Sequence, residues 1–357
     1  MSADTDPERG EFTVPRASAG SADAPPTVSV IICAYTMERW DNLASAVESL
    51  ARQSLAPIET IIVIDGNSEL EQRARSAFPD ALVLLNAYDQ GLSGGRRTGA
   101  EGASGAVLAF LDDDAIADPD WLEQLCGPFA DPHVLGVGGL IDPLWERSAP
   151  GWFPAEFNWV VGCTYAGMPV ERGRIRNPIG ANMSVRADVL ARTGTFDARL
   201  GRAPGGAVVS GAAEETEFSI RASRIHPMHY WIYEPKARVQ HSVPPQRATW
   251  SYFVRRCVVE GSAKALLARF TGAADGLQSE RNYAVAVLPR AVLRELAIGA
   301  RGDVHGFARA GAIIAGLTIT SVSYARTRVA LQRAALRGDT DAQPDGAAQM
   351  PVGRSAR

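Results

Sequence analysis

The amino-acid sequence predicts an α/β fold with a doubly wound sheet, followed by a C-terminal helical region. Three short apolar segments, at 27–34, 60–65 and 81–85, have the length and composition of strands that are buried on both faces. Segments with helical spacing separate them, and a fourth apolar strand is expected at 106–111. This alternation of strands and helices predicts a parallel sheet with helices on both sides.

The first predicted helix, at 42–53, carries Leu43, Val47 and Leu50 at helical spacing and so has one apolar stripe. A later helix starts at Asp118-Pro119, where Asp is a good N-cap and Pro suits the first turn. The other predicted helices are at 70–78, 91–105, 186–192, 214–224, 248–270 and 283–337, and the later strands are at 134–140, 177–186, 229–233 and 237–240.

The segment 142–176 is unusually aromatic for a loop, and it contains several Pro and Gly residues. One interpretation is a lid packed on the core. The other is a surface that binds an acceptor, because sugar rings and apolar groups both stack on indole rings. The two interpretations are compatible. The aromatic residues concerned are Trp145, Trp152, Phe153, Phe157, Trp159 and Tyr165.

Composition excludes some classes of function. The net charge of -4 gives no indication of a nucleic-acid partner. Only Lys236 and Lys264 are lysines, so the abundance of Arg indicates compositional bias and not phosphate recognition. The four Cys residues include no CxxC pair, so neither a zinc site nor a disulfide framework is expected. This use of cysteine fits a protein in a reducing compartment. The tails 1–26 and 341–357 are expected to be disordered.

Asp112, Asp113 and Asp114 directly follow the fourth predicted strand. Clustered carboxylates are tolerated when they are solvated or when a cation lies between them. If the chain stays extended, Asp112 and Asp114 point to the same side. The run therefore indicates a metal at the carboxyl end of the sheet, where open α/β folds bind ligands; the alternative is a solvated turn with a helix-capping Asp.

Several separated segments together resemble family 2 glycosyltransferases of the GT-A fold, over about 28–261. The resemblance implies a Rossmann-like, doubly wound mixed sheet. It also implies a catalytic domain at 27–247, with a nucleotide-sugar half at 27–117 and an acceptor half at 118–247, before a helical region at 248–340. The matching segments are 30–35 (VIICAY), 63–68 (VIDGNS), 91–96 (GLSGGR), 109–114 (AFLDDD), 180–186 (GANMSVR), 194–197 (GTFD), Gly211, 214–218 (EETEF) and His241.

Such enzymes move a sugar from a nucleoside diphosphate to an acceptor hydroxyl, with inversion at the anomeric carbon. The resemblance implies a hexosyltransferase that uses Mn²⁺ or Mg²⁺ to neutralise the leaving diphosphate. It makes Asp114 a direct metal ligand and places Asp112 near the ribose or in support of the metal, with Asp113 in either role. His241 is a candidate third ligand, and a structural His is the alternative.

The resemblance assigns donor binding to residues at the ends of the first strands. Asp65 would accept a hydrogen bond from the base and suits a uracil, which favours a UDP-sugar; the alternative is a turn-forming Asp before Gly66. Ala34 and Tyr35 are also assigned to the donor, and Arg96 is expected near the base or the diphosphate.

The resemblance makes Glu215 the general base that deprotonates the acceptor hydroxyl. Glu214 and Glu217 are the competing candidates, because all three acids open the same predicted helix. The alternative to any catalytic role is that these acids only stabilise the start of a solvated helix.

The acceptor is expected to be a hydroxyl of a glycan, a glycolipid or another glycoconjugate, and a polyprenyl phosphate is the alternative. Two other classes stay open. A nucleotidyltransferase would need a Gly-rich loop after the first strand, which is absent here. A non-catalytic module that binds a sugar or nucleotide would not need the acids at the metal and base positions.

The C-terminal region raises the question of a membrane. The uncharged run 310–325 is shorter than the roughly 20 apolar residues of a spanning helix, so no transmembrane anchor is expected. Nine Arg oppose only Glu295 and Asp303 at 281–337, which favours peripheral contact with an anionic inner leaflet. An ordinary helical subdomain is the alternative. The expected location is the cytoplasm.

Overall fold

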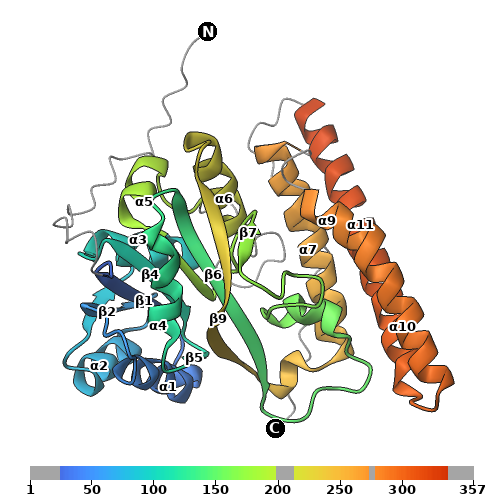
Figure 1. The fold of residues 1–357 in the computed structure, drawn as a ribbon, viewed down its shortest axis with the longest axis horizontal. Helices are drawn as coiled ribbons and strands as arrows, with labels where there is room; N and C mark the ends of the chain where they lie inside the picture. The colour runs from blue at the N-terminus through green and yellow to red at the C-terminus, as the bar shows by residue number, and fades with distance from the viewer. Residues whose placement is uncertain (1–24, 198–212, 273–277, 337–357) are drawn as a thin grey trace.

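The computed structural model describes residues 25–197, 213–272 and 278–336. Nearly all of the two predicted tails, and Gly211 of the resemblance, lie outside these residues. The described chain forms one mixed sheet with helices on both sides, and a group of long helices lies against one edge of the molecule (Figure 1).

The first four strands form the parallel part of the sheet, in the order β3-β2-β1-β4. This order confirms the parallel, doubly wound arrangement predicted for the first half of the chain. Helices fill the connections between the strands, as a parallel sheet requires. The strands are β1 (Val28–Ala34), β2 (Glu59–Ile64), β3 (Leu82–Leu85) and β4 (Val107–Asp112).

The rest of the sheet is mixed and continues from β4 in the order β8-β6-β9-β5, with β7 paired to β9. β8 is antiparallel to β4 and to β6, whereas β6 and β9 are parallel. The fold is therefore the predicted mixed α/β sheet. These strands are β5 (Ala115–Ala117), β6 (Val134–Trp145), β7 (Gly173–Ile175), β8 (Asn182–Arg186) and β9 (Tyr230–Val243).

β9 differs from the prediction, because one long strand replaces the two short ones expected at 229–233 and 237–240. The register between β6 and β9 shifts between Glu234 and Arg238. These two residues of β9 pair with two adjacent residues of β6, so the residues between them form a bulge. Pro235 lies inside this bulge, where the missing N–H of proline is tolerated. The proline and the bulge interrupt the strand pattern in the sequence without ending the strand.

Two hydrophobic cores lie on the two faces of the sheet. Val30 and Ile32 of β1 belong to one core, whereas Ile31 belongs to the other, as the alternation of side chains along a strand requires. A Cβ added at Gly99 would lie 2.4 Å from Ile31 Cγ2, so glycine lets its helix approach the sheet closely. The helices of this part are α1 (Trp40–Ala51), α2 (Ser68–Ala77), α3 (Leu92–Gly102), α4 (Trp121–Cys126), α5 (Ala187–Thr193) and α6 (Glu214–Ile225).

The C-terminal helices pack against one another, and α7 lies between the sheet and α11 (Figure 1). A Cβ added at Gly261 of α7 would lie 2.3 Å from the Thr320 carbonyl oxygen of α11, so the two helices are in close contact. The helical elements after the sheet are η6 (Pro245–Arg247), α7 (Trp250–Thr271), α9 (Gln278–Asn282), the π-helical η7 (Tyr283–Val287), α10 (Leu288–Ala300) and α11 (His305–Leu336).

The aromatic segment is packed on the core and on α7. Trp152, Phe153 and Phe157 lie with their ring centroids 5.6, 6.0 and 5.2 Å from that of Phe253. The short helix η3 (Ala155–Val161) forms part of this segment. This packing supports the interpretation of the segment as a lid on the core.

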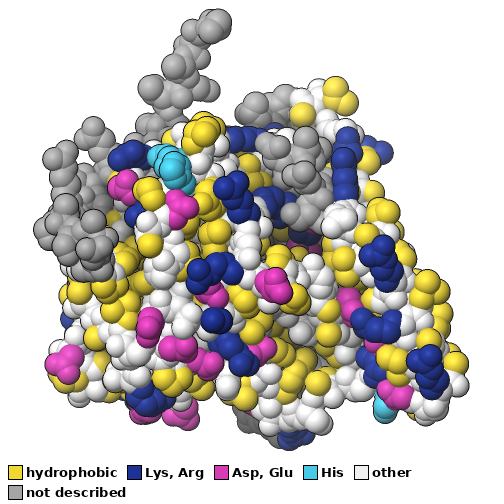
Figure 2. All heavy atoms as spheres, viewed as in Figure 1, with side chains coloured by type: hydrophobic (Ala, Val, Ile, Leu, Met, Phe, Trp, Pro, Cys, Tyr) yellow, Lys and Arg dark blue, Asp and Glu magenta, His cyan; other side chains and the backbone are white. Residues whose placement is uncertain are grey.

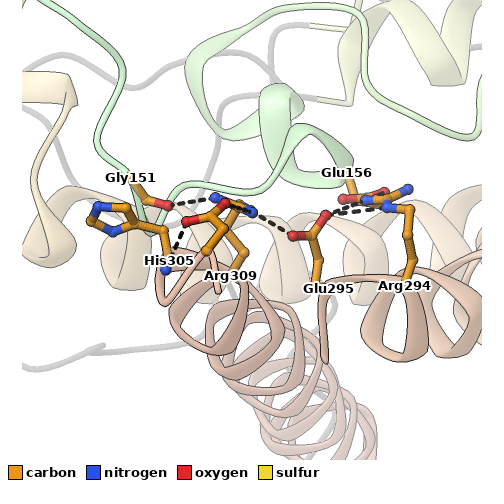
Figure 3. A network of polar contacts seen from close by, with 7 residues as sticks. Gly151, Glu156, Arg294, Glu295, His305 and Arg309 are labelled. Atoms are coloured by element: carbon orange, nitrogen blue, oxygen red, sulfur yellow. Dashed lines mark hydrogen bonds and ion pairs between the residues drawn. The ribbon is translucent and has the colours of Figure 1, made fainter. Parts of the chain in front are cut away.

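A network of ion pairs ties the aromatic segment to α10 and α11 (Figure 3). Arg294 donates to Glu156 at 2.9 Å and to Glu295 at 2.7 Å. Arg309 donates to Glu295 at 2.6 Å and to the Gly151 carbonyl at 3.2 Å. Both glutamates are buried.

α11 is long and apolar enough to span a membrane by length and composition alone. Only 33% of its most apolar 18-residue stretch is buried within the molecule. The uncharged run considered in the sequence covers only part of this helix, because the helix continues on both sides of it. The expectation of no transmembrane anchor stays a prediction.

Candidate active site

The acidic run forms a turn and not the extended chain that the sequence suggested. Asp112 is the last residue of β4, and Asp113 and Asp114 form the turn into β5. β5 pairs with β9 so that Ala115 lies opposite His241. This pairing gathers Asp112, Asp114 and His241, whose carboxylate oxygens and ring nitrogen lie within 4.8 Å of one another.

Asp114 lies at the centre of this cluster and is buried. Its Oδ1 atom is 3.0 Å from His241 Nε2, and its Oδ2 atom is 3.3 Å from Arg39 Nη1 and 3.4 Å from Arg247 Nη2. Burial disfavours the charged forms of Asp114 and His241, but their mutual attraction outweighs it. The pKa of Asp114 therefore lies well below its ordinary value, and the pKa of His241 is raised to about 10.

Asp113 lies beside the cluster without belonging to it. Its Oδ1 atom accepts a hydrogen bond from Arg39 Nη1 at 2.9 Å, whereas its buried Oδ2 atom has no hydrogen-bond partner within the described chain. Burial raises the pKa of Asp113 to about 7, and the neighbouring acids add to the rise against the opposing charge of Arg39. Its assignment to the donor stays a prediction.

The three acids at the start of α6 have different surroundings. Glu214 is buried, and its Oε1 atom is 3.4 Å from Arg96 Nη1. Glu217 forms an ion pair with Arg221 at 2.8 Å along the same helix. Glu215 is partly exposed and lines two cavities. Burial, followed by the adjacent charge of Glu214, raises the pKa of Glu215 to about 8.

Two cavities meet at Glu215. The smaller, of about 130 Å³, is lined by Asp112, Asp114 and His241. The larger, of about 480 Å³, lies between the aromatic segment and the helices α7 and α9. The residues that line both cavities are Gly162, Ile179, Glu215 and Arg256.

The remaining predicted donor residues are placed differently. Asp65 accepts hydrogen bonds from Asn86 Nδ2 at 2.7 Å and from the Gly91 N–H at 2.9 Å, so its carboxylate organises the loop before α3. Tyr35 is exposed at the end of β1 and Ala34 is buried beside it. None of the three predicted residues Asp65, Tyr35 and Ala34 lines either cavity.

Arg96 joins the two sides of the smaller cavity and is only 3% exposed. Its guanidinium lies 3.8 Å from Asp112 and 3.4 Å from Glu214, and it approaches the ring of Phe196. A Cβ added at Gly180 would lie 2.5 Å from its Nη2 atom, so glycine leaves the space that Arg96 occupies. Arg96 thus connects the acidic turn to the start of α6.

Sequence reasoning missed three arginines that line the smaller cavity, Arg39, Arg247 and Arg256. Arg39 and Arg247 pair with the acidic turn across long sequence distances, so no local pattern reveals them. Arg256 is half-buried and has no ion pair or hydrogen bond within the described residues. Arg256 is one of four cations in α7, and nothing in the local sequence indicates that it faces a cavity.

Comparison with known proteins agrees with this geometry. Residues 29–194 match the family described as glycosyl transferase family 2. The chain is 35% identical over 244 residues to the glucosyl-dolichyl phosphate glucuronosyltransferase of Haloferax volcanii. The aligned residues cover 67% of this chain and 77% of that protein. The chain belongs to glycosyl transferase family 2.

Further relatives support this family and its fold. The succinoglycan biosynthesis protein ExoM of Rhizobium meliloti is 26% identical over 72% of this chain and 80% of its own length. The mannosyltransferase PcManGT from Pyrobaculum calidifontis, solved with GDP-Man and Mn²⁺, superposes with a TM-score of 0.55 at 17% identity, over 85% of this chain and 89% of that chain. The family 2 chain therefore has a GT-A fold and is a glycosyltransferase, which excludes the nucleotidyltransferase and the non-catalytic module as its class.

Proposed function

We propose that this glycosyltransferase transfers a sugar, with inversion, from a nucleoside diphosphate sugar to a sugar hydroxyl on a polyprenyl-phosphate-type lipid. A UDP-sugar is the proposed donor. The observation that carries the proposal is the position of Glu215 where the acid-lined cavity meets the larger one. We also propose that the catalytic domain spans 27–247 and that the helical region spans 248–340.

The acid-lined cavity suits a divalent cation and the diphosphate of the donor. Asp112, Asp114 and His241 offer carboxylate oxygens and one imidazole nitrogen at a common point, a set that suits Mn²⁺ or Mg²⁺. His241 must be neutral to bind a metal. When bound, the cation supplies positive charge that neutralises the departing diphosphate. The mannosyltransferase PcManGT, which shares the fold, was solved with Mn²⁺.

Glu215 supplies the base of the proposed reaction. Its carboxylate accepts the proton of the acceptor hydroxyl while that oxygen attacks the anomeric carbon, and the bond from that carbon to the diphosphate oxygen breaks. Attack from the larger cavity approaches the sugar from the side opposite the diphosphate, which gives inversion. Arg96 holds Glu214 in place beside this base.

The larger cavity has the character of a saccharide site. Trp159, Tyr165 and Tyr283 supply aromatic surface, and Arg176 with Glu280 supply polar groups that can bind hydroxyls. The relative from Haloferax volcanii, named for glucuronosyl transfer with glucosyl-dolichyl phosphate, supports a lipid-linked acceptor. A polyprenyl phosphate without a sugar is the alternative acceptor.

The test measures donor binding and turnover on the purified chain. UDP-, GDP- and dTDP-sugars are titrated with and without Mn²⁺, and turnover is followed on glucosyl-polyprenyl phosphate, on polyprenyl phosphate and on a soluble glycan. Metal-dependent binding of a UDP-sugar is expected. Glu215→Gln should lower turnover by about 10²–10⁴-fold and keep donor binding, because only proton transfer is removed.

Asp114→Ala should abolish the metal-dependent part of donor binding, and Asp80→Ala, at an exposed acid outside the site, serves as the control. Normal turnover of Glu215→Gln would exclude it as the base. Binding of another nucleotide class would overturn the UDP assignment, and turnover only on the soluble glycan would overturn the lipid-linked acceptor.

A further inference from the structure

We propose that the outer surface of α10 and α11 lies flat on an anionic lipid bilayer and so places the larger cavity next to membrane-borne acceptors. The second part of this inference rests on the proposed function, and the first part does not. α10 and α11 form an outer edge of the molecule (Figure 1).

The exposed hydrophobic side chains of the described chain gather on this edge. Of its twenty exposed large hydrophobic residues, nine lie at or after residue 285. Figure 2 shows hydrophobic side chains, interleaved with basic ones, along the edge formed by α10 and α11. The nine are Val285 (77% exposed), Leu293, Leu296, Val304, Phe307, Ile314, Val322, Val329 and Leu336.

α11 exposes several large apolar side chains that a helix in water would usually bury. Five large apolar residues recur about every two turns on its exposed side, from Phe307 to Leu336. Its buried side consists mostly of small or polar residues, such as Gly316, Ser323 and Thr327, and contains only two large apolar residues, Ile313 and Leu331. Small residues between helices and apolar residues facing outward are typical of helices in contact with lipid.

The charge of this surface favours an anionic membrane over a neutral partner. Asp303 is the one exposed acid on α10, α11 and their connection, and it is paired with Arg309. Juxtaposed apolar and basic side chains bind bilayers that carry negative headgroups. The exposed arginines of the surface are Arg290, Arg294, Arg301, Arg326, Arg328 and Arg333.

The packing of α11 favours a position along the membrane and not across it. α11 is packed along α7, where Gly261 allows close contact. The opposite side of α7 carries Arg256, Glu260 and Lys264, which line the larger cavity. A helix held against this polar cavity wall cannot also cross the hydrocarbon core, because the wall would have to enter it.

The larger cavity lies next to the proposed membrane surface. Tyr283 and Val287 of η7 line the cavity, while Val285 of the same short helix is 77% exposed. η7 leads directly into α10. A lipid-linked sugar could therefore reach Glu215 while its lipid stays in the bilayer, which deepens the proposed function.

The test is flotation of the full chain with vesicles of phosphatidylglycerol and phosphatidylcholine in equal parts, or of phosphatidylcholine alone. Salt-sensitive flotation with the anionic vesicles is expected. Ile314→Glu should weaken it at least about tenfold, because an apolar side chain is replaced by a charge. Ile58→Glu is the matched control, since Ile58 (51% exposed) and Ile314 (54%) are similarly exposed on different parts of the molecule.

A second pair of variants tests the charges. Arg326→Gln with Arg328→Gln should weaken binding by roughly fivefold per arginine, whereas Arg52→Gln with Arg147→Gln, at exposed arginines elsewhere, should not. Circular dichroism verifies that each variant folds.

Three outcomes would overturn the proposal. The first is no flotation with anionic vesicles, and the second is flotation that resists alkaline carbonate, as a spanning helix would show. The third is a dimer that forms without lipid, does not bind vesicles and is dissociated by Ile314→Glu. The vesicles contain neither donor nor acceptor, so failure of the proposed acceptor would leave flotation unchanged.

Discussion

Glu215 combines two properties that a general base needs. It faces the cavity that would hold the acceptor, and its pKa is raised to about 8 by burial and by the charge of Glu214. A base whose pKa lies near the operating pH is strong enough to take a proton and is still partly ionised. Glu214 and Glu217 do not line this cavity, and each is paired with an arginine.

The pH dependence of kcat/KM tests this assignment. Because Glu215 must be ionised to act, we expect kcat/KM to rise with pH through about 8. Glu214→Gln removes a neighbouring negative charge, so it should move this rise to lower pH. Glu217→Gln is the control and should leave the profile in place. A profile that Glu214→Gln does not move would contradict the assignment.

Arg256 is a second residue whose role follows from its surroundings. The other arginines that line the smaller cavity are paired with carboxylates, whereas Arg256 has no such partner in the described part of the chain. A half-buried guanidinium without a counter-charge is suited to a phosphate or diphosphate of a substrate. Its position at the junction is compatible with either substrate.

We expect Arg256→Gln to weaken binding of a phosphate-bearing substrate by roughly 10–100-fold, the typical effect of losing a charged hydrogen bond. Isothermal titration with UDP tests the donor, and KM for the lipid acceptor tests the acceptor. Arg255→Gln is the matched control, because Arg255 is exposed and lines neither cavity. Unchanged values for both substrates would show that Arg256 binds neither.

At the scale of elements, α9 forms a wall of the larger cavity and is held there by charge. Glu280 accepts hydrogen bonds from Arg176 at 2.8 and 2.9 Å and from Lys264 at 2.9 Å. Burial opposes the ionisation of Glu280, but these cations outweigh it and lower its pKa to about 2. The short helix therefore depends on these contacts for its position against α7.

Glu280→Gln should raise the KM for the acceptor about tenfold and leave donor affinity unchanged, because charge-assisted hydrogen bonds that position the cavity wall are lost. Steady-state kinetics with each substrate varied in turn would measure this. Glu101→Gln, which removes an ion pair with Arg97 outside the larger cavity, is the control. An equal loss of donor affinity would mean that α9 does not act on the acceptor alone.

At the scale of the whole molecule, the C-terminal helices complete the site and are not an appendage. α7 supplies part of the cavity wall, and the network around Glu295 fixes α10 and α11 to the aromatic segment (Figure 3). Burial would raise the pKa of Glu295, but Arg294 and Arg309 outweigh it, so the pKa is lowered. Glu295 therefore stabilises the fold above its ordinary pKa of 4.5, and this contribution is lost as the pH falls below it.

We expect Glu295→Gln to lower the free energy of unfolding by about 1–3 kcal/mol at neutral pH, because two arginines lose a charged partner. The difference from the unchanged protein should shrink below pH 4.5. Urea unfolding at both conditions measures it. Asp188→Asn, at an exposed ion pair with Arg192, should cost much less. If Glu295→Gln lowered the free energy of unfolding only as much as Asp188→Asn does, the network would not hold the helices.

The sequence was sufficient to predict the parallel half of the sheet, because continuous apolar segments indicate strands that are buried on both faces of the sheet. It did not predict β5 and β7, because strands of three residues carry no periodic pattern. β5 nevertheless determines the geometry of the site, because its pairing with β9 brings His241 to the acidic turn. His241 could be named before the structure only through the family resemblance.

Arg39 and Arg247, unlike Arg96, could not be predicted for a related reason. Arg39 pairs with Asp113 although the two are 74 residues apart, and such contacts arise only from the packing of the fold. In a chain where nearly every cation is Arg, composition gives these residues no prominence. Charge pairing across the sheet edge is therefore information that only three-dimensional structure supplies.

The junction of the two cavities at Glu215 has a consequence for inhibitor design. A compound that joins a nucleotide to a sugar mimic through a short linker could occupy both cavities at once, because they share Gly162, Ile179 and Arg256 as well as Glu215. Once one half is bound, the other half is held at a high effective concentration near its own cavity. Such a compound could discriminate among family 2 enzymes through its acceptor half, since the larger cavity is built from the aromatic segment and the C-terminal helices.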